Sequence, residues 1–440
     1  MTARPRPNVV VIMADDLGYG DLALYDGWIE TPALDAMAAE GLRLTDFHSS
    51  GAVCSPTRAG LLTGRYQQRA GIPNVIYANP AWNRHHGLQP EETTVAELLR
   101  AEGYATGVVG KWHLGYGGET NPLRHGFETF HGYVSGNVDY FSHVDGFGNH
   151  DWWAGETNRE EPGYVTHLIN DHAVAFIERH AAGDRPFFLY VAHEAPHFPY
   201  QGPNDAAFRL VGERIPEQRE PARVKRAYRE MVEEMDTGIG AIAETLRRLG
   251  LAERTFVFFL SDNGATAAGS NGPLRGFKAS LWEGGHRVPA VAWWPGAIAA
   301  GGTTDAVMTS IDLAATVLDV ADVLPPVERP LDGVSLLPHL LGSAAPDDRD
   351  LFWAYQQARR PVEQLAMRRG AWKLIVNGPG GPDVALYNLD EDLGETTNLV
   401  ASEPDRAAAM RTALDAWRAD VQAGATAQPA PAFSPGEAAP

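Results

Sequence analysis

The chain has 440 residues, a hydrophobic content of 44% and a formal net charge of −20 at pH 7. This size and composition are typical of a globular protein with one large domain or two unequal ones. The negative charge opposes binding to nucleic acid or to anionic membranes, although salt screening still permits a small anionic substrate. No apolar run reaches the ~20 residues of a membrane helix, so we expect no contact with a membrane.

The N-terminus carries two arginines, Arg4 and Arg6, before the apolar run Val9 to Ala14. This run is too short for a signal peptide, and Asp15-Asp16 follow where a cleavage site should be. We therefore expect a cytoplasmic protein as the sequence is written, or a periplasmic or secreted one if a leader has been removed.

Short β-branched or aromatic runs alternate with helical patterns over the first three quarters of the chain. The expected strands are 9–14, 105–109, 186–192, 255–260 and 288–294, and the expected helices are 31–41, 94–102, 168–180, 224–249 and 313–320. The helix at 224–249 has the clearest pattern, because its apolar residues recur three or four positions apart. This alternation predicts an α/β domain with a central sheet that helices cover on both faces.

The pattern changes after the proline-rich stretch between Pro325 and Pro330. Short strands at 351–355, 365–368, 372–376 and 384–387 alternate with glycine and proline turns, and a helix is expected at 404–421. We predict a large domain at 1–344, a small α+β domain with a short antiparallel sheet at 345–422, and a disordered tail at 423–440, which is rich in alanine and proline,.

Two acidic or amide pairs follow predicted strands: Asp15-Asp16 and Asp262-Asn263. Ligands bind at the carboxyl ends of strands in open α/β sheets, and adjacent carboxylates repel each other unless a cation neutralises them. Hard oxygen ligands suit Ca²⁺ or Mg²⁺ better than zinc. Helix caps and turns are the other common use of these residue types, and the occurrence of two such pairs favours a metal site.

Cys54 is the only cysteine, so it cannot form a disulfide within the chain. A buried apolar side chain, a metal ligand and a reactive thiol remain open. Its neighbours Pro56 and Arg58, at the start of a predicted helix, favour chemistry.

Lysine and histidine side chains occur beside other predicted strands. Lys111 and His113 follow the strand at 105–109 and are flanked by glycines, which suits anion binding and proton transfer,. His197 follows the strand at 186–192, and Lys278 precedes the glycine-rich segment at 283–285. Considered one at a time, His197 could be a structural histidine and Lys278 a solvated surface lysine.

Aromatic and hydrogen-bonding residues are concentrated at 82–86 and 137–153. Such mixtures stack against sugar or aryl rings, whereas a long insertion that packs on itself would show the same composition. Histidines 125, 131, 143 and 150 match no zinc motif,. The candidate substrate-binding residues are Trp82, His85, His86, Asn137, Asp139, His143 and Trp152.

In these motifs and in their order, the chain resembles the type I sulfatases of the alkaline phosphatase superfamily over nearly its whole length. Cys54-Ser-Pro-Thr-Arg58, followed by Leu61-Leu-Thr-Gly-Arg65, is similar to the family signature. The other motifs of the family are matched in the same order by the segments 13–22, 110–115, 196–197, 262–264 and 278–285. The resemblance implies an alkaline phosphatase-like fold, with a large mixed central sheet sandwiched by helices, and hydrolysis of aryl or carbohydrate sulfate monoesters.

The resemblance also implies the residue roles. A separate formylglycine-generating enzyme would oxidise Cys54 to Cα-formylglycine, whose hydrate is the nucleophile of a double displacement. Ca²⁺, or Mg²⁺ in its place, would be bound by Asp15, Asp16, Asp262, Asn263 and the modified Cys54. Arg58 and Lys111 would hold the hydrate, His197 and Lys278 would assist departure of the alcohol, and His113 would remove the proton that allows sulfate to leave.

Two other functions remain open from the sequence. A phosphonate or phosphate ester hydrolase of the same superfamily could share this machinery, and a non-catalytic binder of sulfated glycans would leave Cys54 unmodified. The expected partners are a sulfate ester substrate and the modifying enzyme, with no nucleic acid. The natural substrate and the oligomeric state are left open.

Overall fold

The computed structural model describes residues 6–213, 220–345, 348–357 and 362–430. Strands in these ranges form a sheet of ten, a sheet of four and a separate pair. In spatial order the large sheet consists of β11 (Gly302–Thr304), β2 (Leu42–Leu44), β10 (Ala290–Trp293), β9 (Thr255–Ser261), β1 (Asn8–Ala14), β8 (Phe187–Ala192), β4 (Ala105–Lys111), β5 (Thr129–Tyr133), β6 (Trp153–Ala154) and β7 (Thr157–Asn158). The pair is β3 (Phe47–His48) with β12 (Met308–Thr309).

The centre of the large sheet is parallel and its margins are partly antiparallel. β1 lies between β8 and β9 and is parallel to both, and β4 is parallel to β8 and β5. β10 and β6 run antiparallel to their neighbours β9 and β5. The predicted large mixed sheet is therefore confirmed.

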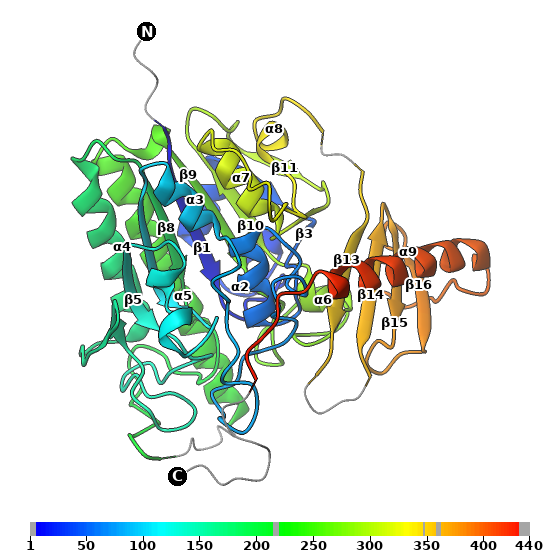
Figure 1. The fold of residues 1–440 in the computed structure, drawn as a ribbon, viewed down its shortest axis with the longest axis horizontal. Coiled ribbons are helices and arrows are strands. Elements are labelled where there is room, and N and C mark those ends of the chain that lie inside the picture. Colours follow the sequence, from blue (N-terminus) through cyan, green and yellow to red (C-terminus); the bar gives the residue numbers. More distant parts are fainter. Residues whose placement is uncertain (1–5, 214–219, 346–347, 358–361, 431–440) are drawn as a thin grey trace.

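Helices cover both faces of this sheet (Figure 1). Side chains alternate along a strand, so Val10 and Ile12 of β1 enter one core while Val9 and Val11 enter the other,. The first core packs against α1 (Pro32–Ala39), α4 (Val165–Ala181) and α5 (Pro221–Arg248), and the second against α2 (Cys54–Thr63), α3 (Val95–Ala101) and α7 (Asp312–Val320). The remaining helices of this part are short: α6 (Glu283–His286) and α8 (Leu337–Leu340). The predicted helices and strands lie within a few residues of the observed ones.

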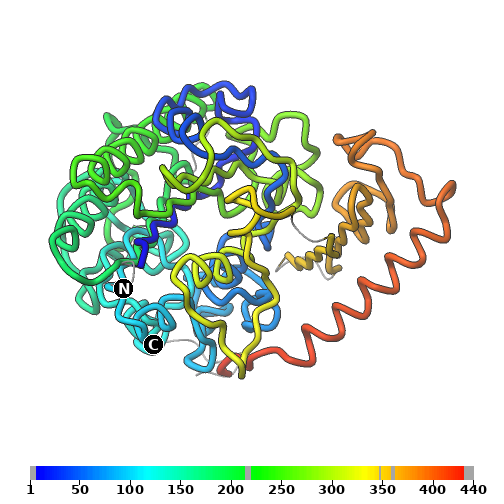
Figure 2. Tube along the Cα trace, turned by 90° about the horizontal axis from the view of Figure 1, so that it is seen from above, coloured from blue at the N-terminus to red at the C-terminus, as the bar shows by residue number. Residues whose placement is uncertain are grey.

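The four-stranded sheet lies beside the large one, as Figures 1 and 2 both show. It is antiparallel and follows chain order: β13 (Leu351–Tyr355), β14 (Gln364–Arg369), β15 (Trp372–Val376) and β16 (Val384–Asn388). Met410, Leu414 and Trp417 of α9 (Pro404–Ala423) pack against its apolar face. The predicted domain boundary at residue 345 stays a prediction, and the sheet begins shortly after it.

The segment after α9 differs from the expected disordered tail where the structure describes it, up to residue 430. The backbone N–H of Thr426 donates to the carbonyl of Arg69, and Gln428 Nε2 donates to the carbonyl of Gly87. These hydrogen bonds hold residues 424–430 against the large domain, and residues 431–440 of the predicted tail lie outside the described part of the chain. Among the described helices, none is both long and apolar enough to cross a membrane.

Candidate active site

Four parallel strands of the large sheet end at one edge, and the residues that follow them form the site. β1 leads into Asp15 and Asp16, β4 ends at Lys111, and β9 leads into Asp262. β8 is followed by the segment that carries His197. The carboxyl ends of parallel strands meet at the same edge, so residues far apart in the sequence converge there.

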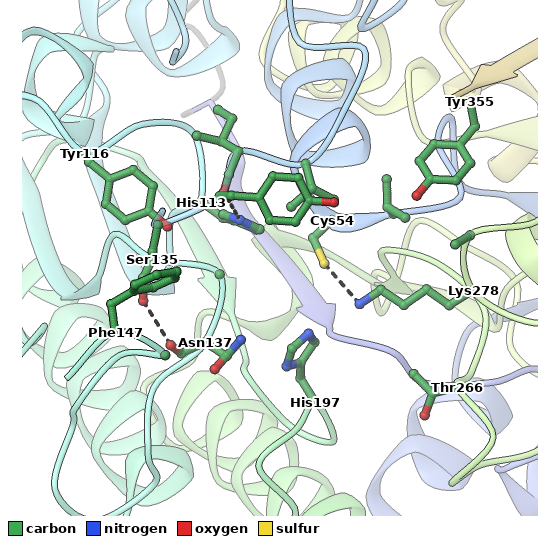
Figure 3. A pocket seen from close by; sticks show the side chains of 18 of the residues that line it. Cys54, His113, Tyr116, Ser135, Asn137, Phe147, His197, Thr266, Lys278 and Tyr355 are labelled. Carbon is green, nitrogen blue, oxygen red and sulfur yellow. Dashed lines mark hydrogen bonds between the residues drawn. The ribbon is translucent and has the colours of Figure 1, made fainter. Parts of the chain in front are cut away.

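Cys54 is the first residue of α2 and lies at the centre of this edge (Figure 3). Its Sγ is 3.6 Å from an oxygen of Asp15 and 3.3 Å from Lys278 Nζ. Burial and the charge of Asp15 raise the pKa of the thiol to about 12. The unmodified thiol is therefore protonated near neutral pH, and a protonated thiol is a poor nucleophile.

Asp15, Asp16, Cys54 and His197 form a cluster that could hold a metal ion. One ligand atom from each lies within 4.8 Å of the others. Asp16 adopts a positive φ of 66°, which turns its side chain into the cluster, and His197 Nε2 is 3.6 Å from Asp16 Oδ2. The sequence expected His197 only as an acid–base residue, and the structure brings it among the carboxylates.

Asp262 and Asn263 adjoin this cluster. Asp262 Oδ1 accepts a hydrogen bond from the Asp16 backbone N–H at 3.2 Å, and Asn263 Nδ2 donates to Asp16 Oδ1 at 2.7 Å. Asn263 Oδ1 is buried, and no hydrogen-bond donor reaches it within the described residues. An unsatisfied buried oxygen beside three carboxylates fits a hard cation such as Ca²⁺ or Mg²⁺.

Two buried cations, Arg58 and Lys111, form ion pairs with Asp15 and Asp262. Arg58 Nη2 is 2.9 Å from Asp262 and 3.5 Å from Asp15, and Lys111 also pairs with Asp15. Burial alone would raise the pKa of Asp15, but Lys111 and Arg58 hold it below its usual value. Burial raises the pKa of Asp262, and repulsion from Asp15 raises it further. Asp262 is thus held less firmly in its ionised form than Asp15, although Arg58 lies closer to it.

Lys278 points its amino group toward Cys54, as Figure 3 shows. Its Nζ is 2.5 Å from Asp16 Oδ1, and its backbone N–H donates to the carbonyl of Ala265. Burial would lower the pKa of Lys278, but Asp16 and Cys54 raise it well above its usual value. The lysine is therefore a fixed positive charge next to the Cys54 side chain.

His113 carries an unprotonated nitrogen in the buried part of the site. Its Nε2 donates to the carbonyl of Ile76 at 2.9 Å, which leaves Nδ1 as the lone-pair nitrogen, without a partner in the described chain. Burial, followed by the charges of Lys111 and Arg58, lowers its pKa well below 6.5. A methyl group at Gly136 would lie 2.8 Å from Nε2, so this ring position depends on glycine there.

A cavity of about 550 Å³ opens above these groups. Cys54, His113, His197 and Lys278 all line it, and so does Asn137 among the predicted substrate residues. Its other walls include aromatic side chains from four separate segments, Tyr77, Tyr116, Phe147 and Tyr355 (Figure 3). The sequence analysis missed these four. Of these four, only Tyr116 could have been found from its neighbours in the sequence, because it directly follows the motif at 110–115.

Asp139, His143 and Trp152 do not line this cavity, so their role as substrate contacts stays a prediction. The Asp139 carboxylate accepts hydrogen bonds from four backbone N–H groups, and His143 packs on the Trp152 ring at 4.8 Å. Trp152 donates its indole N–H to Glu161. All three are buried, so they serve the alternative role of packing the insertion on itself.

Trp82, His85 and His86 also lie outside this cavity. Trp82 is 41% exposed and packs edge-on against Tyr77, with ring centroids 4.6 Å apart. Trp82 therefore does not line the cavity itself, but it contacts Tyr77, which does. His85 and His86 line a second cavity.

Known proteins share this arrangement of fold and motifs. The family profile described as Sulfatase matches residues 7–323, and that described as N-sulphoglucosamine sulphohydrolase, C-terminal, matches residues 277–419. N-acetylgalactosamine-6-sulfatase of Canis lupus familiaris is 37% identical over 369 residues, which cover 79% of this chain and 68% of the relative. Arylsulfatase G of Rattus norvegicus is 32% identical over 464 residues, which cover 92% and 84%.

Solved structures agree on the fold. The crystal structure of Ps i-CgsB in complex with k-i-k-neocarrahexaose has a TM-score of 0.84 and 26% identity, and the match covers 95% of this chain and 94% of that chain. The phosphonate monoester hydrolase of Agrobacterium radiobacter has a TM-score of 0.64 and 21% identity, so it shares the fold alone. Since the Sulfatase profile spans most of the chain, this protein belongs to the sulfatase family of the alkaline phosphatase superfamily and is a hydrolase of sulfate esters.

Proposed function

We propose that this protein hydrolyses carbohydrate sulfate esters and that Cys54, converted to Cα-formylglycine by a formylglycine-generating enzyme, is the catalytic residue. The observation that carries the proposal is the position of Cys54. It lies at the base of a cavity, within 4.8 Å of the acidic cluster and 3.3 Å from Lys278. At this place the negative charge of a sulfuryl group would lie beside both a bound cation and Lys278.

Asp15, Asp16, Asp262 and Asn263 would hold Ca²⁺ or Mg²⁺. The ion would supply positive charge that stabilises the sulfate group, and the hydrated aldehyde at position 54 would supply the oxygen nucleophile. The unsatisfied Asn263 oxygen and the raised pKa of Asp262, which a bound cation would lower, support this ligand set.

The chain's own side chains divide the remaining tasks. Arg58 and Lys111 keep the carboxylates ionised and present positive charge beside the side chain at position 54. Lys278 and His197, which line the cavity beside Cys54, would assist departure of the alcohol. His113 accepts a proton at Nδ1, because its Nε2 already donates to a carbonyl,.

A sugar rather than a simple aryl group is the proposed alcohol. One relative is named as a sulfatase of N-acetylgalactosamine, and the solved structure with 26% identity contains a carbohydrate chain. The cavity offers aromatic faces for stacking and Asn137 for hydroxyl groups, a combination that suits sugars,. Arylsulfatase G, another relative, favours aryl sulfates as the second candidate substrate class.

A substrate panel tests this function. We expect protein with converted Cys54 to hydrolyse at least one sulfated sugar with a higher kcat/KM than 4-nitrophenyl sulfate, and to act on a matched phosphonate monoester far more slowly. A preference for the phosphonate would contradict the sulfatase assignment. Glycan binding without turnover, by protein whose Cys54 is converted, would favour the non-catalytic binder.

His113→Ala is expected to lower kcat on the order of 10²-fold, because it removes the proton acceptor at Nδ1. Since the pKa of His113 lies well below 6.5, the wild-type kcat should show no loss with an apparent pKa near 6.5 as the pH is lowered. Steady-state rates between pH 5 and 8 check both points. An acidic limb near pH 6.5 that disappears in His113→Ala would contradict the neutral state of this histidine.

A further inference from the structure

A second cavity of about 590 Å³ adjoins the catalytic one. The two share a wall, because Tyr116 lines both. Figure 3 shows the Tyr116 hydroxyl turned toward His113. Arg84 lies over the ring of the same tyrosine, with its guanidinium carbon 4.9 Å from the ring centroid. The second cavity therefore lies next to the catalytic one, with the ring of Tyr116 at their common wall.

Polar side chains form part of the wall of the second cavity. Arg84, His85 and His86 line it, and within the described part of the chain their side chains have no hydrogen-bond or ion-pair partner. Burial, and then His85, lowers the pKa of His86, so its ring is neutral at pH 7. Glu119, whose carboxylate is a hydrogen-bond acceptor, also lines this cavity. Unused donors and an acceptor around an aromatic ring suit a ligand with many hydroxyl groups.

The second cavity is fixed relative to the catalytic residues. Gly87 bridges to Gly115, two residues after His113, and the backbone N–H of Leu88 donates to the carbonyl of Leu114 at 2.8 Å. Gln428, from the segment after α9, exchanges hydrogen bonds with the backbone of Gly87 at 2.9 and 3.0 Å. The wall that carries His85 and His86 is thus hydrogen-bonded to the segment that carries His113. These bonds fix the distance between the two cavities.

We propose that the second cavity binds the sugar unit next to the sulfated one, so that the substrate is an oligosaccharide bound across Tyr116. The inference rests on the proposed carbohydrate sulfatase function and extends it. A volume of about 590 Å³ is within the ~300–1,000 Å³ of small-molecule sites and leaves room for a sugar ring with bridging water,. Arg84, His85 and His86 donate to its hydroxyl or acidic groups, and Glu119 accepts from its hydroxyl groups.

Substrates of different length distinguish binding in the second cavity from binding at the catalytic site. Every sulfated sugar that the substrate panel shows to be hydrolysed is offered as a monosaccharide and as the terminal unit of a trisaccharide, with 4-nitrophenyl sulfate as the short reference. We expect wild-type protein to prefer the trisaccharide. Arg84→Ala and His85→Ala should each lower kcat/KM for the trisaccharide about tenfold, mainly through KM, and change it less than about twofold for 4-nitrophenyl sulfate. Arg100→Ala, at an exposed arginine of α3, is the matched control.

Binding without turnover gives a second measurement. In the Cys54→Ala background, calorimetry with the same trisaccharide should show about tenfold weaker binding when Arg84 is also replaced, with no change for the monosaccharide. Equal effects of Arg84→Ala on long and short substrates, no effect on either, or equal wild-type kcat/KM for monosaccharide and trisaccharide would overturn the second site. If protein with converted Cys54 hydrolyses aryl sulfate but no sulfated sugar, the carbohydrate function itself fails, and the second site fails with it.

Discussion

Cys54→Ala is expected to lower kcat on any sulfate ester by more than about 10⁴-fold, the scale on which hydrolases lose activity when their nucleophile is removed. The physical reason is that the lysine and histidine side chains beside Cys54 cannot take its place. Lys278 is a fixed cation paired with Asp16, and the histidines are held by carbonyl groups at the nitrogen that carries their proton. Initial rates with 4-nitrophenyl sulfate and with the preferred sulfated sugar measure the effect.

The wild-type protein made without the modifying enzyme is the matched control for this experiment. Its Cys54 remains a thiol with a pKa of about 12, so it should be as inactive as the alanine variant. Activity should rise in proportion to the fraction of protein whose intact mass is about 18 Da lower, the change expected for conversion of cysteine to the aldehyde. Turnover by Cys54→Ala, or by protein of unchanged mass, would refute the assigned role of this residue.

Lys373→Met is expected to lower the free energy of unfolding by about 3–5 kcal/mol, because it leaves two buried carboxylates without their shared cation. Lys373 Nζ on β15 lies 2.8 Å from Glu283 and 2.9 Å from Glu395, and all three side chains are fully buried. Burial, and then repulsion from Glu283, raises the pKa of Glu395 to about 7 even though Lys373 opposes the shift. Urea unfolding at pH 8, where both carboxyl groups would remain ionised, should show the largest loss.

Lys225→Met is the control, because Lys225 is an exposed lysine on α5 that lies over the ring of Trp28. We expect that variant to change the free energy of unfolding by less than about 0.5 kcal/mol. If Lys373→Met were as stable as Lys225→Met, this prediction would be wrong. The ion pairs of Lys373 with Glu283 and Glu395 would then not stabilise the contact between the small sheet and the large domain. Glu283 follows Lys278 by five residues, so its ion pair with Lys373 also links the small sheet to the segment that carries Lys278.

Much of the site could be predicted because its residues follow strands. The strand expected at 255–260 is β9, Thr255–Ser261, and Asp262 comes next in the chain. The same holds for Asp15 after β1, so the convergence of these carboxylates follows from parallel pairing alone,. Both facts depend on hydrophobic runs of a few residues, which can be recognised without knowing the rest of the fold.

The substrate-binding predictions fared differently. Asp139 and His143 belong to an aromatic and polar segment that seemed suited to sugars, yet backbone N–H groups and neighbouring rings occupy their side chains. Tyr355, on β13 of the small sheet, lines the catalytic cavity although it is about 300 positions away from Cys54 in the chain. Composition indicates what a segment can bind, but not which of its side chains remain free to do so.

By itself, the sequence determined the α/β class, most helices and strands, the edge of the sheet that carries the acidic cluster, and the family, because these depend on short-range periodicity and on motifs of a few residues. The tertiary structure alone decided which aromatic rings face Cys54, that His113 has its lone pair at Nδ1, and that His85 and His86 line a second cavity beyond Tyr116. The reason is physical. The direction of a side chain and the partners that satisfy it are set by packing between segments far apart in the chain, and no local pattern records that packing.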